Sequence, residues 1–186
     1  MTLSALGIFS AAGAGGGPAG DYELIQTQIL ASATPSVTFS NLGNFSSTYR
    51  HLQVRMTTRT DGSIFEGYVR LNGDTGANYA YHQLVGTGSS VVASSGIGIT
   101  GFSQFANAVS TSPANSFGAS VFDLLDAYST TKNKTGRAFL GVGGEFVYLR
   151  SGLWLNTASI TSIQLLINGS GNFVTGSRFS LYGIRG

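Results

Sequence analysis

The chain has 186 residues, only 10% of which are charged, and a formal net charge of +2. This low charge excludes an extended polyelectrolyte and a highly charged helical bundle, because about a quarter of the residues in an average domain are charged. The small positive excess comes from a shortage of acids and does not indicate a nucleic-acid-binding surface. The absence of cysteine excludes a disulfide scaffold, a thiolate nucleophile and a cysteine-ligated metal site.

The first segment, residues 1–20, contains no charged side chain and ends in a stretch rich in glycine and alanine. Its apolar part is shorter than the roughly 20 residues that a membrane span needs. A signal peptide is a second interpretation, although no Lys or Arg precedes the apolar residues. We expect a flexible arm, because a glycine-rich backbone cannot pack a core of its own. Its apolar side chains would gain by burial on a partner, and the candidate anchoring residues are Leu3, Leu6, Ile8 and Phe9.

From Tyr22 onward, apolar and polar residues alternate with a period of two, which is typical of strands that bury one face. The clearest case is 51–57, where Leu52, Val54 and Met56 share one face. Turn residues at 61–62 and 72–74 bracket another strand that carries Val69 and Leu71. Further strands are expected at residues 36–40, 79–84, 116–125, 137–142, 145–150, 160–167 and 178–184.

Three connections are less regular. Residues 86–115 are rich in glycine, serine and alanine, which predicts a long loop with at most one weak strand. A brief helix is expected inside this loop, near Ser103 to Val109. The turns at residues 72–75 and 168–172 are both predicted to close hairpins.

Eight or nine short strands without a convincing amphipathic helix predict an all-β fold, an antiparallel β-sandwich and, within that class, a jelly roll. We expect an N-terminal arm over residues 1–20 and a single domain over residues 21–186. The 24 Ser and 18 Thr of the whole chain indicate a neutral, hydroxyl-rich surface. Such a surface can be covered by another subunit at low electrostatic cost, so composition fits either subunit assembly or a soluble sandwich with neutral faces.

No motif in the sequence predicts catalysis or a bound cofactor or metal. The serine-containing turns do not match a nucleophile elbow, and the glycine run near the start lacks the flanking strand, helix and lysine of a phosphate-binding loop. His51 and His82 have no second ligand at metal spacing and are expected at the surface or at a strand edge. Asp123 and Asp126 are expected to end a strand and to accept hydrogen bonds from the turn that follows. The alternative of a glycosidase would need two facing acids, for which the candidates are Asp61, Glu66, Asp74 and Glu145.

The aromatic residues offer one further interpretation. Most of the eight tyrosines are expected in the core or at subunit contacts. Tyr79 and Tyr81 share one face of a predicted strand and are the candidate contacts if a glycan is bound.

The C-terminal residues 176–186 resemble the closing strand of small tailed-bacteriophage virion proteins, and residues 160–165, 122–129 and 6–9 extend the similarity. The resemblance implies a jelly roll, a homotrimer and a place in the virion, after assembly in the bacterial cytoplasm. The implied role is a capsid decoration or cement protein, whose partners are further copies of the chain and the major capsid protein or another virion protein. The alternative role is a tail-fibre or receptor-binding tip that recognises host glycans. From the missing motifs, the small net charge and the short apolar segment, we expect no enzyme activity, no cofactor and no binding of nucleic acid or membrane.

Overall fold

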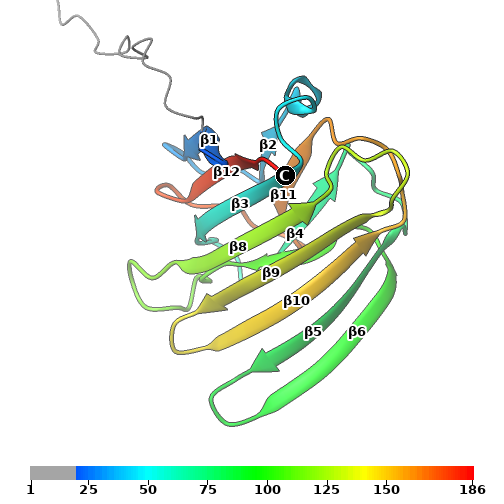
Figure 1. Ribbon diagram of the computed structural model, residues 1–186. Helices are drawn as coiled ribbons and strands as arrows, with labels where there is room; N and C mark the ends of the chain where they lie inside the picture. The colour runs from blue at the N-terminus through cyan, green and yellow to red at the C-terminus, as the bar shows by residue number, and fades with distance from the viewer. Residues whose placement is uncertain (1–19) are drawn as a thin grey trace, which may run out of the picture.

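The computed structural model describes residues 20–186 (Figure 1). The proposed anchoring residues Leu3, Leu6, Ile8 and Phe9 lie outside the described residues, so their role stays a prediction. The described chain forms strands and one short 3₁₀ helix. In chain order they are β1 (Tyr22–Ile29), β2 (Ser36–Phe39), η1 (Leu42–Phe45), β3 (His51–Thr58), β4 (Glu66–Leu71), β5 (Tyr79–Gly86), β6 (Val91–Ile99), β7 (Phe102–Ala106), β8 (Gly118–Leu125), β9 (Lys134–Val142), β10 (Phe146–Trp154), β11 (Ile163–Ile167) and β12 (Arg178–Ile184).

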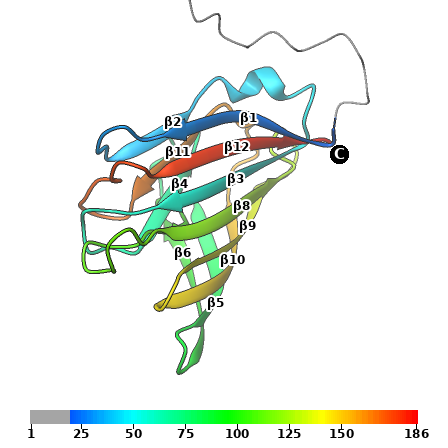
Figure 2. The same cartoon turned by 90° about the vertical axis from the view of Figure 1, so that its left-hand side faces the viewer.

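The strands form two antiparallel sheets that pack face to face (Figures 1 and 2). The larger sheet has eight strands in the order β1-β12-β3-β8-β9-β10-β5-β6, and the smaller has four in the order β2-β11-β4-β7. The predicted antiparallel β-sandwich is therefore confirmed. The finer expectation of a jelly roll and the boundary between arm and domain stay predictions.

The core lies between the two sheets and is rich in aromatic side chains. Tyr79 stacks on Trp154 with ring centroids 6.1 Å apart and meets Phe102 edge-on at 5.1 Å. Such pairs contribute about 0.5–1.5 kcal/mol each beyond the burial of their area. Because these inward-pointing side chains fix β5 and β10, the alternate residues of the same strands must point away from the smaller sheet.

A buried lysine joins two loops at one end of the sandwich. The Nζ of Lys134 donates to the carbonyls of Ser129 at 2.6 Å, Thr157 at 3.0 Å and Lys132 at 3.1 Å. These three acceptors match the three donors of an ammonium group. Burial lowers the pKa of Lys134 below its usual value. Lys134 thus links the β8–β9 loop to the segment that follows β10.

Most strands predicted from the period of two are present. The strand predicted at 51–57 is β3, and the strand between the two turns is β4. The predictions at residues 36–40, 79–84, 116–125, 137–142, 145–150, 160–167 and 178–184 correspond to β2, β5, β8, β9, β10, β11 and β12, with ends that differ by a few residues.

The prediction of a long loop with a helix at Ser103 to Val109 is wrong. Residues 91–99 and 102–106 form the strands β6 and β7 instead. All five residues of β7 are buried, so both of its faces are covered and no alternation marks it in the sequence. β6 is exposed or partly exposed along its whole length, so neither of its faces is buried and its sequence shows no regular apolar–polar alternation either.

The prediction of hairpins at residues 72–75 and 168–172 is also wrong. Asn72 and Gly73 adopt positive φ values of 54° and 70°, as a tight turn requires. However, this turn leads from β4 in the smaller sheet to β5 in the larger one, and residues 168–172 likewise connect β11 to β12 across the two sheets. Turn chemistry reports a change of chain direction, but it does not show whether the two strands pair.

Candidate functional site

The outer face of the larger sheet, which points away from the smaller sheet, carries a row of apolar side chains. Strand register aligns one residue from each of β8, β9, β10, β5 and β6 side by side. Phe139, Leu149 and Leu84 in this row are 58, 56 and 50% exposed. We call the five residues the apolar row: Val121, Phe139, Leu149, Leu84 and Ala93.

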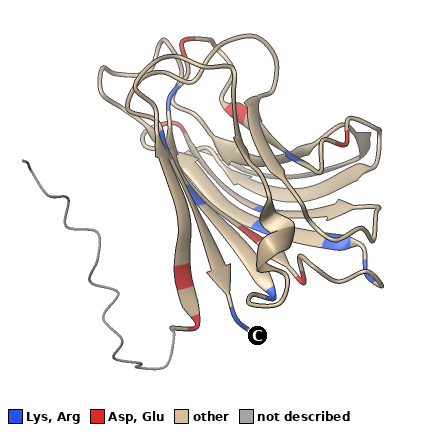
Figure 3. Ribbon diagram, turned by 90° about the horizontal axis from the view of Figure 1, so that it is seen from above, with Lys and Arg blue, Asp and Glu red and all other residues tan. Residues whose placement is uncertain are grey.

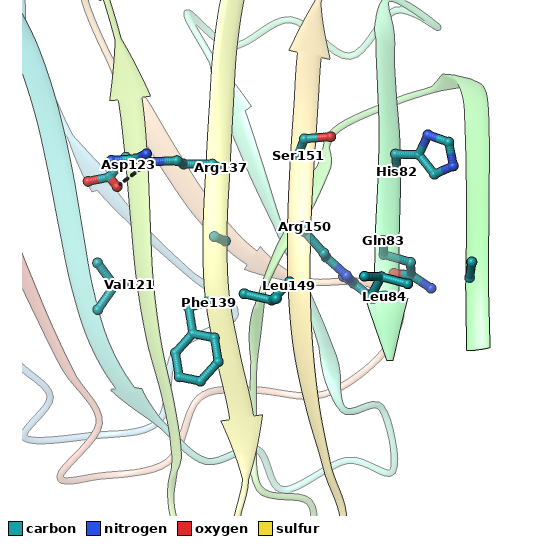
Figure 4. A pocket seen from close by; sticks show the side chains of 12 residues that line it. His82, Gln83, Leu84, Val121, Asp123, Arg137, Phe139, Leu149, Arg150 and Ser151 are labelled. Atoms are coloured by element: carbon teal, nitrogen blue, oxygen red, sulfur yellow. Dashed lines mark hydrogen bonds and ion pairs between the residues drawn. The ribbon is translucent and has the colours of Figure 1, made fainter. Parts of the chain in front are cut away.

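A hollow of about 430 Å³ lies over the apolar row (Figure 4). Its polar side is formed by the next cross-strand row, which contributes Asp123, Arg137, Ser151 and His82. A second depression of about 590 Å³ adjoins the first one along β8 and β9 and shares Val121 and Phe139 with it. We call the first depression the outer hollow. Together the two provide a continuous apolar surface.

The charges beside the outer hollow are paired within the chain. Arg137 Nε donates to Asp123 Oδ2 at 3.0 Å (Figure 4). Gln53 Nε2 donates to the other oxygen, Asp123 Oδ1, at 2.6 Å. A pair of this kind near the surface contributes little to stability. It does mean that an apolar ligand in the hollow would not bury an unpaired charge. The arrangement offers apolar contact area with a polar rim, which is the anatomy of a protein contact surface.

Sequence reasoning did not find this face, although a signal was available. Residues 75–122 contain no Asp, Glu, Lys or Arg, and they supply β5, β6 and β7 and most of β8. Figure 3 shows how small a part of the described chain the charged residues occupy. An uncharged run of this length predicts a surface that avoids the cost of desolvating charges.

The edge strand β6 extends the same neutral surface. It pairs with β5 and has no partner strand on its other side in the described chain. Val91 is 77% exposed and Ile97 is 86% exposed. Protected edge strands usually carry a charge or a proline, and β6 has neither. It is therefore suited to pairing with another chain.

A second cluster lies on the inner side of β5 and β10. The buried guanidinium of Arg150 donates to Glu66 and to the carbonyl and hydroxyl of Ser103. It lies over the ring of Tyr148, 4.3 Å from the centroid, and 5.9 Å from that of Tyr81. Arg150 is thus held by cation–π contacts and by an ion pair.

Of the two candidate glycan contacts, the structure allows only Tyr81. Tyr79 is fully buried, and its hydroxyl accepts a hydrogen bond from the backbone N–H of Leu71 at 3.1 Å. Burial raises the pKa of Tyr79 to about 12. The expectation that Tyr79 could contact a glycan is wrong, because its ring belongs to the core. Tyr81 is partly exposed beside Arg150.

The carboxylates of the two aspartates predicted to accept hydrogen bonds from the turn after β8 bind side chains instead. Asp123 pairs with Arg137, as described above. Asp126 accepts from Lys132 Nζ at 2.6 Å and from Arg50 Nε at 2.7 Å, and these two bonds lower its pKa to about 2. Asp126 does follow the end of β8, and its backbone carbonyl accepts from the N–H of Ser129 in the turn at 3.0 Å, whereas its carboxylate binds cationic side chains.

The remaining titratable residues of the sequence analysis are held by local bonds or exposed. His51 Nδ1 accepts the backbone N–H of Asp126 at 2.9 Å, and His82 is exposed on β5. Among the candidate acids, Asp61 binds Asn172, and Asp74 accepts from the indole of Trp154 at 2.6 Å. Residues 20–186 contain no group of three or more His, Asp or Glu that could hold a metal ion.

Comparison with models of known protein families and with curated proteins gave no match to this sequence. Within the part of the chain that the structure describes, no helix has the length and apolar character needed to cross a membrane.

Proposed function

We propose that the chain is a structural protein of a tailed-bacteriophage particle, a decoration or cement protein that stabilises the capsid as a homotrimer. The observation that carries this proposal is the uncovered apolar row on a face whose charges are few and internally paired. Soluble monomers rarely expose a contiguous apolar patch of this kind unless it contacts a partner. The resemblance of residues 176–186 to phage virion proteins supplies the class of partner.

The chemistry of the outer face fits a stable contact with a capsid shell. Covering half-exposed Phe139, Leu149 and Leu84 contributes about 1 kcal/mol each. The hydroxyl-rich surroundings lose little on desolvation. Several subunits bound to one shell add their contacts through avidity. A neutral sheet face thus strengthens a shell without the salt sensitivity of charged contacts.

The unprotected edge of β6 supports assembly of several copies. Its backbone groups can extend the sheet into a neighbouring subunit, and no charge in residues 75–122 opposes this approach. The number of three subunits rests on the resemblance. Light scattering on the purified chain tests it directly.

The proposal is tested on particles of the phage that encodes the chain. Shells purified without the chain are mixed with the purified protein, and the bound copies are counted by gel densitometry and located by cryo-electron microscopy. We expect saturable binding on the head and greater resistance of the shell to heat. Leu149→Asp should reduce occupancy at least about tenfold, as removal of a central apolar contact does.

Leu24→Asp is the matched control for this experiment. Leu24 is 57% exposed on the same sheet, but it lies on β1, far from the apolar row in strand order. We expect this variant to bind like the unaltered chain. Absence of the chain from purified particles, or density at the tail tip only, would contradict the cement role.

The second candidate function, a receptor-binding tip, is favoured by the cluster of Tyr81, Tyr148 and Arg150. Partly exposed tyrosines beside a cation provide faces on which a sugar ring can stack. A glycan array probed with the purified chain tests it. Binding that is lost in Tyr81→Ala would support the receptor-binding role, and an array without signal would reject it.

A further inference from the structure

We propose that residues 3–9 of the chain's own N-terminal segment cover the outer hollow in the free protein. This inference deepens the proposed function and rests on it for its biological meaning, because the covered face is the one that would meet the shell. The contact itself concerns the free chain and is tested without any particle. The side chains assigned to the apolar row are Leu3, Leu6, Ile8 and Phe9.

The chemistry of the segment matches that of the outer hollow. Residues 1–20 contain no charged side chain, and the apolar residues cluster between Leu3 and Phe9. The hollow offers Phe139, Leu149 and Leu84 at about half exposure, with Asp123 already neutralised by Arg137. An uncharged apolar ligand therefore brings no charge of its own into the hollow, and the charges at the rim are already paired with each other.

The chain is long enough to place this segment on its own sheet. Tyr22 lies on the same outer face as the hollow, since its ring stacks on Tyr182 at 4.7 Å and Arg55 lies 5.2 Å from its centroid. Strand register places Tyr22 at the same height in the sheet as the last residues of β8. Its strand, β1, lies four strands away from β9 in the sheet order. Four strand spacings are about 19 Å, and Phe139 lies four residues further along, about 13 Å. The span is therefore about 23 Å.

The linker length favours the chain's own hollow over that of another copy. Residues 10–21 connect Phe9 to Tyr22 and are rich in glycine and alanine. Twelve residues of this type have an r.m.s. end-to-end distance of about 19 Å and a maximum reach of about 40 Å. A tether gives the highest effective concentration when its r.m.s. length is close to the span, so the intramolecular contact forms before a second copy can compete.

The experiment uses the absence of cysteine from the chain, which leaves no background thiol. Ser4→Cys is combined with Ser151→Cys, at the exposed rim of the outer hollow, in the otherwise complete chain. Mild oxidation is followed on non-reducing gels. We expect a cross-linked monomer that migrates faster than the reduced chain. Its rate of formation should exceed that of the control pair at least about tenfold, because docking raises the local concentration of one thiol near the other.

The control pair is Ser4→Cys with Ser47→Cys. Ser47 is exposed and lies near Tyr49, whose hydroxyl donates to Glu23 at the start of β1, so it is close to the point where the segment leaves the sheet. Random encounter would favour Ser47, whereas docking favours Ser151. Equal or faster cross-linking at Ser47 overturns the proposal. Disulfide-linked dimers and trimers at Ser151 overturn the assignment to the chain's own segment.

A second measurement keeps the proposal open to refutation if the double variants misfold. Deletion of residues 2–17 should raise the fluorescence of an apolar dye that binds exposed hydrophobic surface. A labelled peptide with the sequence of residues 1–12 should bind the deleted chain and displace the dye. Leu149→Asp should weaken this binding at least about tenfold, and Leu24→Asp should leave it unchanged within about twofold. A peptide that does not bind the deleted chain rejects the contact, whatever the result on particles.

Discussion

The eight-stranded sheet ends in β1 on one side and in β6 on the other, and the two ends differ in charge. At the β1 end, Arg55 lies 5.2 Å from the ring centroids of both Tyr22 and Tyr182, and Arg185 pairs with Glu23 at 3.2 Å. At the β6 end, β5 and β6 carry no charge, and Arg150 on the neighbouring β10 is buried against Ser103 and Glu66 of the smaller sheet.

The two ends of one sheet can therefore differ in how far their side chains have partners within the chain. At the β1 end, the charged groups of Arg185 and Glu23 pair with each other, and the rings of Tyr22 and Tyr182 stack beside Arg55. Both end strands are open edges in the described chain and both expose apolar side chains, but β1 carries the charged Glu23 whereas β6 carries no charge. If the contrast has functional meaning, substitutions at the β1 end should change stability, and exposed substitutions at the β6 end should change association.

The largest effect on stability is expected from the one charge that is buried near the β6 end. Arg150→Ala removes the partner of Glu66 and the donor to Ser103, and it leaves space between Tyr148 and Tyr81. We expect the free energy of unfolding to fall by about 3 kcal/mol, near the lower bound for a broken buried pair because Glu66 is 39% exposed. Urea denaturation measures it. Arg150→Met, which keeps the volume, should cost less, and an equal loss in both would show that packing is not involved.

The next effect is expected at the β1 end. Tyr22→Ala removes the stacked pair with Tyr182 and one of the two rings beside Arg55. The expected loss in the free energy of unfolding is about 1–2 kcal/mol, measured by thermal or chemical denaturation. Tyr22→Phe keeps the ring and loses only the hydroxyl bond to Gln53, so it should retain most of the stability. A Phe variant as unstable as the Ala variant would contradict a role for stacking.

A smaller effect is expected from the ion pairs of Asp126, and it should depend on pH. The folded-state pKa of this carboxyl is about 2, below its ordinary value of 3.8. A lowered pKa means that the stabilisation is fully present above pH 3.8 and is lost as the pH falls towards 2. Asp126→Asn should therefore flatten the dependence of the melting temperature on pH between about 4 and 2. An unchanged slope in this window would show that Lys132 and Arg50 do not stabilise the charged form.

The smallest effect on stability, with a clear effect on association, is expected at the open edge. Ile97→Lys places a charge on β6 where the side chain is 86% exposed. We expect the free energy of unfolding to change by less than about 0.5 kcal/mol and the self-association seen by sedimentation to weaken. Ile29→Lys, on the opposite edge strand β1 and 54% exposed, is the matched control and should associate normally. Equal association in both variants would remove β6 from the subunit contact.

The sequence predicted the class of fold and most strands because those strands bury one face only. β3 alternates buried and more exposed residues along its whole length, and that pattern is visible in the letters alone. β7 could not be found in this way, since neighbours on both sides bury Phe102 to Ala106. The sequence also could not show that the strands before and after the turn at Asn72 and Gly73 lie in different sheets. A turn reverses the chain direction, but it does not determine which sheet the next strand joins.

The candidate site was harder to predict than the fold. The residues of the apolar row come from five strands whose order in the sheet differs from their order in the chain. Only the register brings Val121 beside Phe139, and Leu149 beside Leu84. The lack of charge in residues 75–122 is visible in the sequence and predicts which part of the chain supplies the site. It does not predict which face of the sheet carries the site. Burial of Tyr79 likewise depends on Trp154, which lies 75 residues away in sequence.

The buried ammonium group of Lys134 has a practical consequence. The chain contains only two lysines, and Lys132 is exposed whereas Lys134 is enclosed by three carbonyls. Amine-reactive dyes should therefore modify Lys132 in the native protein and reach Lys134 only after the loops around it separate. Mass spectrometry of the modified peptides would then report unfolding at one defined place, and this reporter requires no substitution in the chain.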